Sequence, residues 1–316
     1  MKRYCINFDC SEHQSKHLQS ANSGRVSKKG TFYRLCDRRY IQRFKCLVCR
    51  TQFSKATFDP DYRQHRREIN EMLFLFLASG VTQRRSEILL KTDRKTISRK
   101  LKIPGARAKE DHAEWLEERF SETPIRHIQF DDLETVEHTK CKPLSVTLAV
   151  HNKSREILDF QVKRMPAKGP LSRVARKKYG PRKDERPAGW DQLFRNLKSL
   201  LHANVLCESD ENPNYPQFVK SHLPRARHVR HKGARGAIVG QGELKKLKFD
   251  PLFSLNHTCA MLRANVNRLF RKTWSTTKKV ECLVDHLWIY VRYHNAVLVN
   301  SDPGFVPTQR SQLGGG

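Results

Sequence analysis

The chain of 316 residues contains no apolar run near the ~20 residues that a membrane-spanning helix needs. Its first residues also lack the apolar stretch of a secretory signal peptide. These absences argue against an integral membrane or secreted protein and predict a cytoplasmic location. In that compartment the nine cysteines stay reduced, so closely spaced pairs indicate metal binding rather than disulfides.

Acidic residues are also scarce in this chain. Only 32 Asp and Glu stand against 61 Lys and Arg, which gives a formal net charge of +29. This excess runs along the whole chain, and its self-repulsion is costly unless a polyanion binds it. Aromatic residues at 9% and apolar residues at 38% suffice for folded domains and argue against a disordered polycation. Nucleic acid is therefore the expected partner, and an anionic membrane surface is the weaker alternative.

Two cysteine pairs near the N-terminus predict a structural zinc site. Cys46 and Cys49 have the CxxC spacing with which two thiolates bind one tetrahedral Zn²⁺, and Cys5 and Cys10 form a looser pair. Alternative ligands are His13, His17 and Cys36. Ordinary buried thiols are the simpler interpretation of the first pair. A segment this short buries little core, so zinc would supply its folding energy.

Residues 24–46, between the two pairs, mix basic and aromatic side chains. We interpret this segment as a loop suited to contact with a phosphate backbone.

Residues 67–100 have the pattern of three short helices. An apolar face over residues 67–79 predicts the first helix, and Gly80 ends it. Thr82 and Asp93 are suitable N-caps for the second and third helices. Short turns and a basic last helix favour a helix-turn-helix whose last helix enters the major groove of DNA. Its candidate contacts are Arg94, Lys95, Ser98 and Arg99. A small helical bundle with a solvated basic face is the alternative.

From residue 125 the pattern changes to strands. Strands are expected at residues 125–137, 142–150 and 155–162, joined by short turns as an antiparallel meander. A basic stretch follows, then a helix with Trp190 on its apolar face, a strand ending in acids, a helix and a strand. Two helical patterns, at residues 256–272 and 278–295, are the last elements expected. This is the order of an RNase H-like α/β fold, whose mixed sheet gathers ligands at strand ends.

Two aspartates in this order predict a catalytic metal site. Asp131 lies in the first strand and Asp210 at the end of the fourth, 210 − 131 = 79 residues later, and the RNase H-like fold makes these strands neighbours. Their carboxylates would converge on Mg²⁺ or Mn²⁺, which can activate a nucleophile in phosphodiester cleavage. Asp132 and Glu208 are alternatives, although adjacent strand residues face opposite ways.

Three sequence blocks carry a resemblance to a known family: QFDDLETVEHTK, CESDENPNY and LNHTCAMLRANVNRLFRKTW. Together they resemble the catalytic blocks of RNase H-like transposases from bacterial insertion sequences, in particular the group that contains the first-numbered insertion sequence. The resemblance covers roughly residues 1–300 and implies a zinc finger, a helix-turn-helix and an Asp, Asp, Glu triad. It carries the two aspartates onto Asp131 and Asp210, and the glutamate onto Asn256.

Asn256 departs from the family pattern. Its neutral amide oxygen would hold a metal more weakly than a glutamate and could not act as a base, although some related transposases also have Asn there. A helix N-cap is the simpler role for Asn256, and the two roles are compatible. Reserve candidates for an acidic ligand are Glu211, Glu243 and His257.

Basic residues after Asn256 are expected on one helix, where they would contact DNA phosphates. They are Arg263, Arg268, Arg271 and Lys272. We assign no catalytic role to His286 or His294 in the last helix.

These features together predict a metal-dependent transposase that acts on double-stranded DNA as a homo-oligomer, most simply a dimer, near the bacterial nucleoid. The expected parts are a zinc knuckle (residues 1–58), a helix-turn-helix (59–103), a linker into a short helix (104–124), the catalytic core (125–300) and a tail (301–316). The alternatives are a non-catalytic DNA-binding regulator or inactive transposase remnant, and a structure-specific nuclease.

Overall fold

The structure, a computed structural model, describes residues 4–14, 25–35, 38–58, 62–232, 250–270 and 275–299. The chain forms two compact units, residues 1–70 and 71–316. Several predicted features lie outside the described residues: His17, Cys36, Glu243, Arg271, Lys272 and the tail.

The first unit is a small three-stranded antiparallel sheet with the order β1-β2-β3. Its elements are α1 (Ser11–Gln14), β1 (Val26–Arg34), β2 (Arg39–Cys46), β3 (Gln52–Ser54) and the 3-10 helix η3 (Lys55–Phe58). Val26, Phe44 and Phe53 pack around the cysteines as its core. The expected loop at residues 24–46 is therefore wrong, because most of it forms the β1–β2 hairpin.

The three helices expected after this unit are present. They are α2 (Asn70–Ala78), preceded by the 3-10 helix η4 (Arg67–Ile69), α3 (Gln83–Leu89) and α4 (Arg94–Lys100). The Thr82 hydroxyl accepts a hydrogen bond from the Arg85 backbone N–H at 3.3 Å, which confirms the predicted cap of α3. Asp93 holds the N-cap position of α4, but its side chain makes no capping hydrogen bond.

Hydrogen bonds connect these helices to distant parts of the chain. The ring of His286 donates to the Leu77 carbonyl at 2.8 Å, and the Asn267 amide donates to the Val81 carbonyl at 3.0 Å. Both bonds join the α2–α3 region to the C-terminal part of the second unit.

Helix α5 (Lys102–Phe120) occupies most of residues 104–124, where a linker into a short helix was expected. Pro104 lies in its first turn, where the missing N–H costs nothing. Gly105 lies against α10 (Val280–Tyr293), because a Cβ at that position would come within 2.8 Å of the Asp285 backbone. The absence of a side chain at Gly105 thus permits close packing of two helices.

The centre of the second unit is a five-stranded mixed sheet with the order β6-β5-β4-β7-β8. Its strands are β4 (Ile125–Val136), β5 (Pro143–His151), β6 (Ile157–Arg164), β7 (Leu201–Asp210) and β8 (Arg227–His231). The first three form the predicted antiparallel meander, whereas β7 runs parallel to both β4 and β8.

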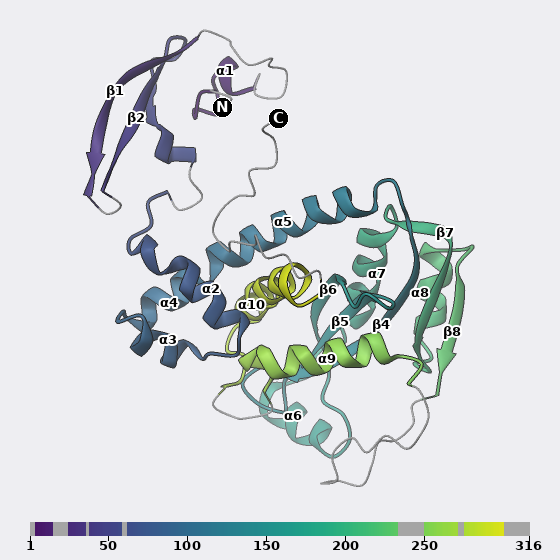
Figure 1. Ribbon diagram of the computed structural model, residues 1–316. Helices are drawn as coiled ribbons and strands as arrows, with labels where there is room; N and C mark the ends of the chain where they lie inside the picture. Colours follow the sequence, from purple (N-terminus) through teal and green to yellow (C-terminus); the bar gives the residue numbers. More distant parts are fainter. Residues whose placement is uncertain are drawn as a thin grey trace. The chain divides into compact units, whose positions relative to one another are not determined.

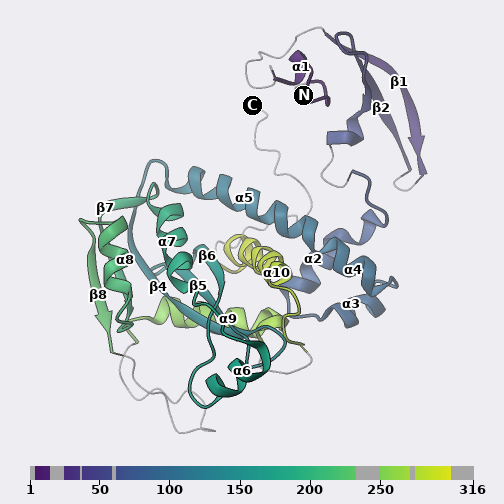
Figure 2. The same cartoon turned by 180° about the vertical axis from the view of Figure 1, so that it is seen from behind.

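Helices cover both faces of this sheet, as Figures 1 and 2 show from opposite sides. The other helices are α6 (Leu171–Tyr179), α7 (Arg186–Leu197), α8 (Tyr215–His222), α9 (Phe253–Asn265), the 3-10 helix η5 (Asn267–Leu269) and the π-helix η7 (His294–Val299). Leu133 of β4 packs with α9 and α10, whereas Phe130 packs with α7 and α8. Side chains of β4 therefore alternate between the two faces of the sheet and pack against the helices on each face.

Three helical predictions need correction. The basic stretch after β6 contains α6, which the sequence did not predict. Helix α9 ends at Asn265 because Val266 is extended, so the expected helix at residues 256–272 is shorter. Asn256 lies inside the first turn of α9 and not at its N-cap. No helix in the described ranges is long and apolar enough to cross a membrane.

Candidate functional site

The register between β4 and β7 brings the two predicted aspartates together. Gln129 of β4 pairs with Glu208 of β7, an offset of 208 − 129 = 79 residues. Asp131 and Asp210 have the same offset, two residues further along each parallel strand, and therefore share one side of the sheet. Asp131 of β4 is thus the neighbour of Asp210, which ends β7.

Asp131 carries the electrostatic mark of this arrangement. Burial is the main cause that raises the pKa of its carboxyl, and the negative charge of Asp210 is the second. Together they raise this pKa to about 7. The Tyr215 hydroxyl donates to Asp131 Oδ1 at 3.2 Å, and the Asp132 backbone N–H donates to the same oxygen at 2.6 Å. These bonds favour the ionised form but do not offset burial and repulsion.

Each aspartate keeps one oxygen available. Oδ1 of Asp210 accepts the Asn212 backbone N–H at 3.0 Å, as Oδ1 of Asp131 accepts its two donors. Among the described residues, neither Oδ2 atom has a hydrogen-bond donor. Two neighbouring carboxylates, each with a free oxygen, fit the way proteins hold Mg²⁺ through one or two carboxylates plus phosphate oxygens.

Tyr215 is a residue of this site that the sequence interpretation missed. Its side chain is fully buried at the start of α8, and burial together with Asp132, Asp131 and Asp210 raises the pKa of its hydroxyl. The hydroxyl therefore stays protonated and can orient Asp131. The available signal was its position a few residues after Asp210, at the start of a predicted helix.

The alternative acids Asp132 and Glu208 have internal partners. Asp132 accepts hydrogen bonds from the Thr147 hydroxyl and from Trp190 Nε1, the latter at 3.0 Å. Glu208 accepts from Gln129 at 2.8 Å, from His127 at 2.7 Å and from His231 at 3.0 Å. Burial alone would raise the pKa of Glu208, but these three bonds lower it.

The side chain of Asn256 is hydrogen-bonded to Asp250 rather than to the two aspartates. Its side chain is exposed, and its amide donates to Asp250 Oδ2 at 2.8 Å. Among the described residues, no hydrogen bond joins it to Asp131 or Asp210. One turn later, Cys259 of α9 is close enough to Asp131 to be affected by its charge. Burial and then this charge raise the pKa of Cys259 to about 12.

Two of the reserve ligands, Glu211 and His257, lie within the described residues. Glu211 is exposed, and one guanidinium nitrogen of Arg155 lies 3.2 Å from the ring of His257. Within the described ranges, no third carboxylate or histidine joins Asp131 and Asp210 closely enough to form a three-ligand cluster.

The predicted DNA contacts on α4 share one exposed surface. They are Arg94, Lys95, Ser98 and Arg99, and Ile97 is buried on the other side of the helix. Arg263 is half-buried on α9. Arg268 was expected on the same helix as Arg263, but it lies on η5. Burial lowers the pKa of Arg268. Cys282 and then Asp285 oppose that shift.

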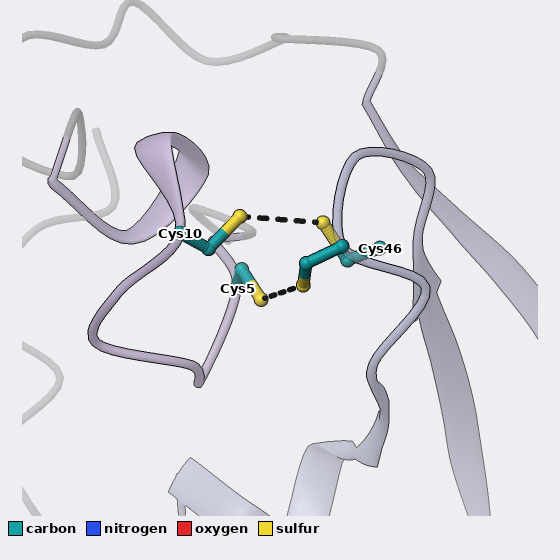
Figure 3. A group of neighbouring side chains, drawn as sticks. Cys5, Cys10 and Cys46 are labelled. Atoms are coloured by element: carbon teal, nitrogen blue, oxygen red, sulfur yellow. Dashed lines mark hydrogen bonds between the residues drawn. The ribbon is translucent and has the colours of Figure 1, made fainter.

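In the first unit, four cysteines form a cluster. The sulfurs of Cys5, Cys10, Cys46 and Cys49 all lie within 4.8 Å of one another, and none is in a disulfide. Figure 3 shows the side chains of Cys5 and Cys10 directed toward the turn that follows β2. The separations of 3.4 Å and 3.9 Å resemble the edge of about 3.8 Å that four Zn–S bonds would give.

Two thiols of the cluster have pKa values shifted in opposite directions. Hydrogen bonds from Thr51 lower the pKa of Cys49 to about 6, so this sulfur is already a thiolate near neutral pH. Burial raises the pKa of Cys5 to about 12 while no cation is present. The ring of His13 lies 2.6 Å from the Cys5 carbonyl, which assigns His13 to the backbone rather than to the sulfurs.

A search of protein-family models finds no match to the chain, and a search of curated proteins finds none either.

The raised pKa of Asp131 predicts a pH-dependent gain of stability from Asp131→Asn in the protein without bound Mg²⁺ or Mn²⁺. The folded pKa of about 7 exceeds the ordinary 3.8, so the ionised carboxylate destabilises the fold fully above pH 7. The cost shrinks as pH falls and vanishes below about pH 4. At pH 8 we expect a gain of at least about 1 kcal/mol, or ~2–4 °C in Tm, and a smaller gain at pH 5.

Thermal unfolding of the zinc-loaded protein in buffer without Mg²⁺ or Mn²⁺, followed by circular dichroism, measures this effect. Glu211→Gln, which changes an exposed acid nearby, should show no such trend. A gain for Asp131→Asn that is equal at pH 5 and pH 8 would contradict the burial of the ionised carboxylate.

Proposed function

We propose that this protein is a metal-dependent DNA transposase with an RNase H-like core. The observation that supports it most is the parallel register of β4 and β7, which makes Asp131 and Asp210 neighbours at a strand end. The strand order β6-β5-β4-β7-β8 and the helices on both faces agree with that fold. The sequence blocks around both aspartates resemble those of insertion-sequence transposases.

The residues of the site have distinct roles in this proposal. Asp131 and Asp210 offer their free Oδ2 atoms to Mg²⁺ or Mn²⁺, which would polarise a phosphate and activate the attacking oxygen. Tyr215 fixes the orientation of Asp131 through its hydroxyl. Trp190 and Thr147 hold Asp132, which belongs to the framework of the sheet.

DNA binding would use two further regions of the chain. The exposed side chains of Arg94, Lys95, Ser98 and Arg99 make α4 the recognition helix of a helix-turn-helix formed with α3. The four-cysteine cluster would hold a structural Zn²⁺, because the few buried side chains around it form too small a core to fold alone. The net charge of +29 matches a polyanionic substrate.

A second candidate is a DNA-binding protein without cleavage activity. The observation in its favour is Asn256, whose amide is exposed and bonds to Asp250 instead of the two aspartates. Two carboxylates without a third ligand would bind a divalent cation weakly until phosphate oxygens complete its shell.

Cleavage of DNA that carries the gene with its native flanks distinguishes these candidates. With Mg²⁺ present, Asp131→Ala and Asp210→Ala should each reduce cleavage by ~10²-fold or more, because each removes a charge that holds the cation. Binding of the same DNA should stay within about twofold, since neither carboxylate contacts phosphate directly.

Glu211→Ala is the matched control, because it removes an exposed acid next to Asp210 and should keep wild-type cleavage. A wild-type protein that binds but does not cleave this DNA would favour the second candidate.

The zinc proposal predicts one Zn²⁺ per chain in metal analysis of the purified protein. Cys46→Ser should lose nearly all of it, because three thiolates hold the ion far less well than four. Cys141→Ser is the control, since Cys141 is a free thiol outside the cluster. Retention of zinc by Cys46→Ser, or its loss from Cys141→Ser, would contradict the ligand set.

A further inference from the structure

A basic cavity lies between helix α6 and the turn that joins β4 to β5. Its volume is about 420 Å³, which is within the range of pockets that hold small ligands. The side chains that give it chemical character are Glu137, Lys142, Arg164, Arg176, Tyr179 and Arg182. The cavity is separate from Asp131, because Glu137 is 137 − 131 = 6 residues further along the chain, or roughly 20 Å for an extended strand.

The segment between β6 and α7 builds this cavity. Met165 and Ala175 are buried and fix the segment to the second unit. Arg182 holds its far end, because its guanidinium donates to Glu137 Oε2 at 3.2 Å and to the Pro143 carbonyl at 3.3 Å. The fold therefore holds Arg182 and Glu137 in place in the lining of the cavity.

Charge in the cavity is strongly unbalanced. Four cations line it against a single carboxylate, Glu137, which is already paired with Arg182. Within the described ranges, Arg164 and Arg176 form no ion pair, and the ammonium of Lys142 lies over the Tyr179 ring at 4.5 Å. The Nε of Arg182 is buried and has no hydrogen-bond acceptor among the described residues.

Such a lining selects for a compact anion of high charge. A phosphate monoester carries about −2 near neutral pH and offers three acceptor oxygens, whereas a phosphodiester within a strand carries only −1. A diester also continues as a chain on both sides, which suits an open track better than a cavity. Arginine forks bind such oxygens through paired hydrogen bonds.

We propose that this cavity binds the 5′-phosphate at the end of a DNA strand. The proposal rests on the proposed function, which creates such ends. In strand hydrolysis the water oxygen bonds to phosphorus, the bond from phosphorus to the 3′ oxygen breaks, and that oxygen takes a proton. The phosphate then stays on the other fragment as its 5′ end. Binding in this cavity holds it away from the carboxylates of Asp131 and Asp210.

The test compares 3′-labelled single-stranded oligonucleotides that carry either a 5′-phosphate or a 5′-hydroxyl. Full-length protein is titrated without divalent cations, and binding is followed by fluorescence anisotropy. The wild type should prefer the phosphorylated strand by about tenfold, which is the usual scale of hydrogen bonds to a charged group. No preference in the wild type would overturn the proposal.

A matched pair of double variants then locates the preference. Arg164→Gln with Arg176→Gln removes two lining cations and should reduce the preference to about twofold or less. Arg173→Gln with Lys177→Gln removes two cations of α6 that do not line the cavity, so both strands should bind more weakly and the preference should remain. An equal loss of preference in both variants would overturn the assignment to the cavity.

A third variant separates shape from charge. Ser172→Phe fills the cavity from an exposed position without changing its charge and should also abolish the preference. A preference that survives it shows that the phosphate binds elsewhere. A 5′-mononucleotide that competes as well as the phosphorylated strand would assign the cavity to free nucleotides and overturn the strand-end proposal.

These oligonucleotides contain no element end and are not cut without a divalent cation. A protein that never cleaves DNA can therefore still show the preference, and an active transposase can lack it. The failure of one proposal is thus distinct from the failure of the other.

Discussion

The parallel pairing of β4 with β7 is the constraint on which the second unit and its acidic site depend. Helix α7 belongs to the connection between β6 and β7 that allows β7 to run parallel to β4. Trp190 and Phe194 of this helix are buried against the sheet. A slip of one residue in this pairing would turn Asp210 to the opposite face. The apolar face of β7 resists that slip, since Val205 and Cys207 are buried.

The repulsion between neighbouring carboxylates destabilises this arrangement. The acidic residues of the sheet fall into two groups. Asp132, Glu208 and Asp159 are held by hydrogen bonds from side chains around them. Asp131 and Asp210 instead each leave an oxygen without a donor among the described residues. An ionised carboxylate that is buried beside a second one, with an oxygen that accepts no hydrogen bond, raises the free energy of the folded state. A bound cation would remove that cost, which is the physical basis of the proposed site.

Much of the second unit could be predicted from the sequence, because its apolar periodicity is strong. Strands β4 to β8 and helices α7, α8 and α10 lie where the pattern indicated. The hairpin of the first unit was missed because basic side chains on its exposed face mask the alternation, leaving Ile41, Phe44 and Cys46 as the buried positions of β2. Helix α5 was expected to be mostly linker, and it contains Pro104 and Gly105, two residues that disfavour a helix; Gly105 packs closely against α10.

The candidate site was predictable only in part. Asp131 and Asp210 follow from strand order, since the parallel register preserves their spacing. The position of Asn256 depends on where α9 begins, and the helix starts three residues before the predicted cap. Tyr215 approaches Asp131 through tertiary packing across 84 residues, which no local pattern encodes. The burial of Arg268 likewise follows from the break of α9 at Val266.

The claim that Asp131 and Asp210 form one divalent-cation site is tested most directly by calorimetric titration of Mn²⁺ into the zinc-loaded protein. The wild type should bind Mn²⁺, and Asp131→Asn and Asp210→Asn should each weaken binding by at least ~tenfold. Asp159→Asn should not, although burial raises the pKa of Asp159 as well, because this acid lies on β6 and its carboxylate is held by Asn196 and Gln161. Binding that is unchanged in both Asp131→Asn and Asp210→Asn would contradict the account.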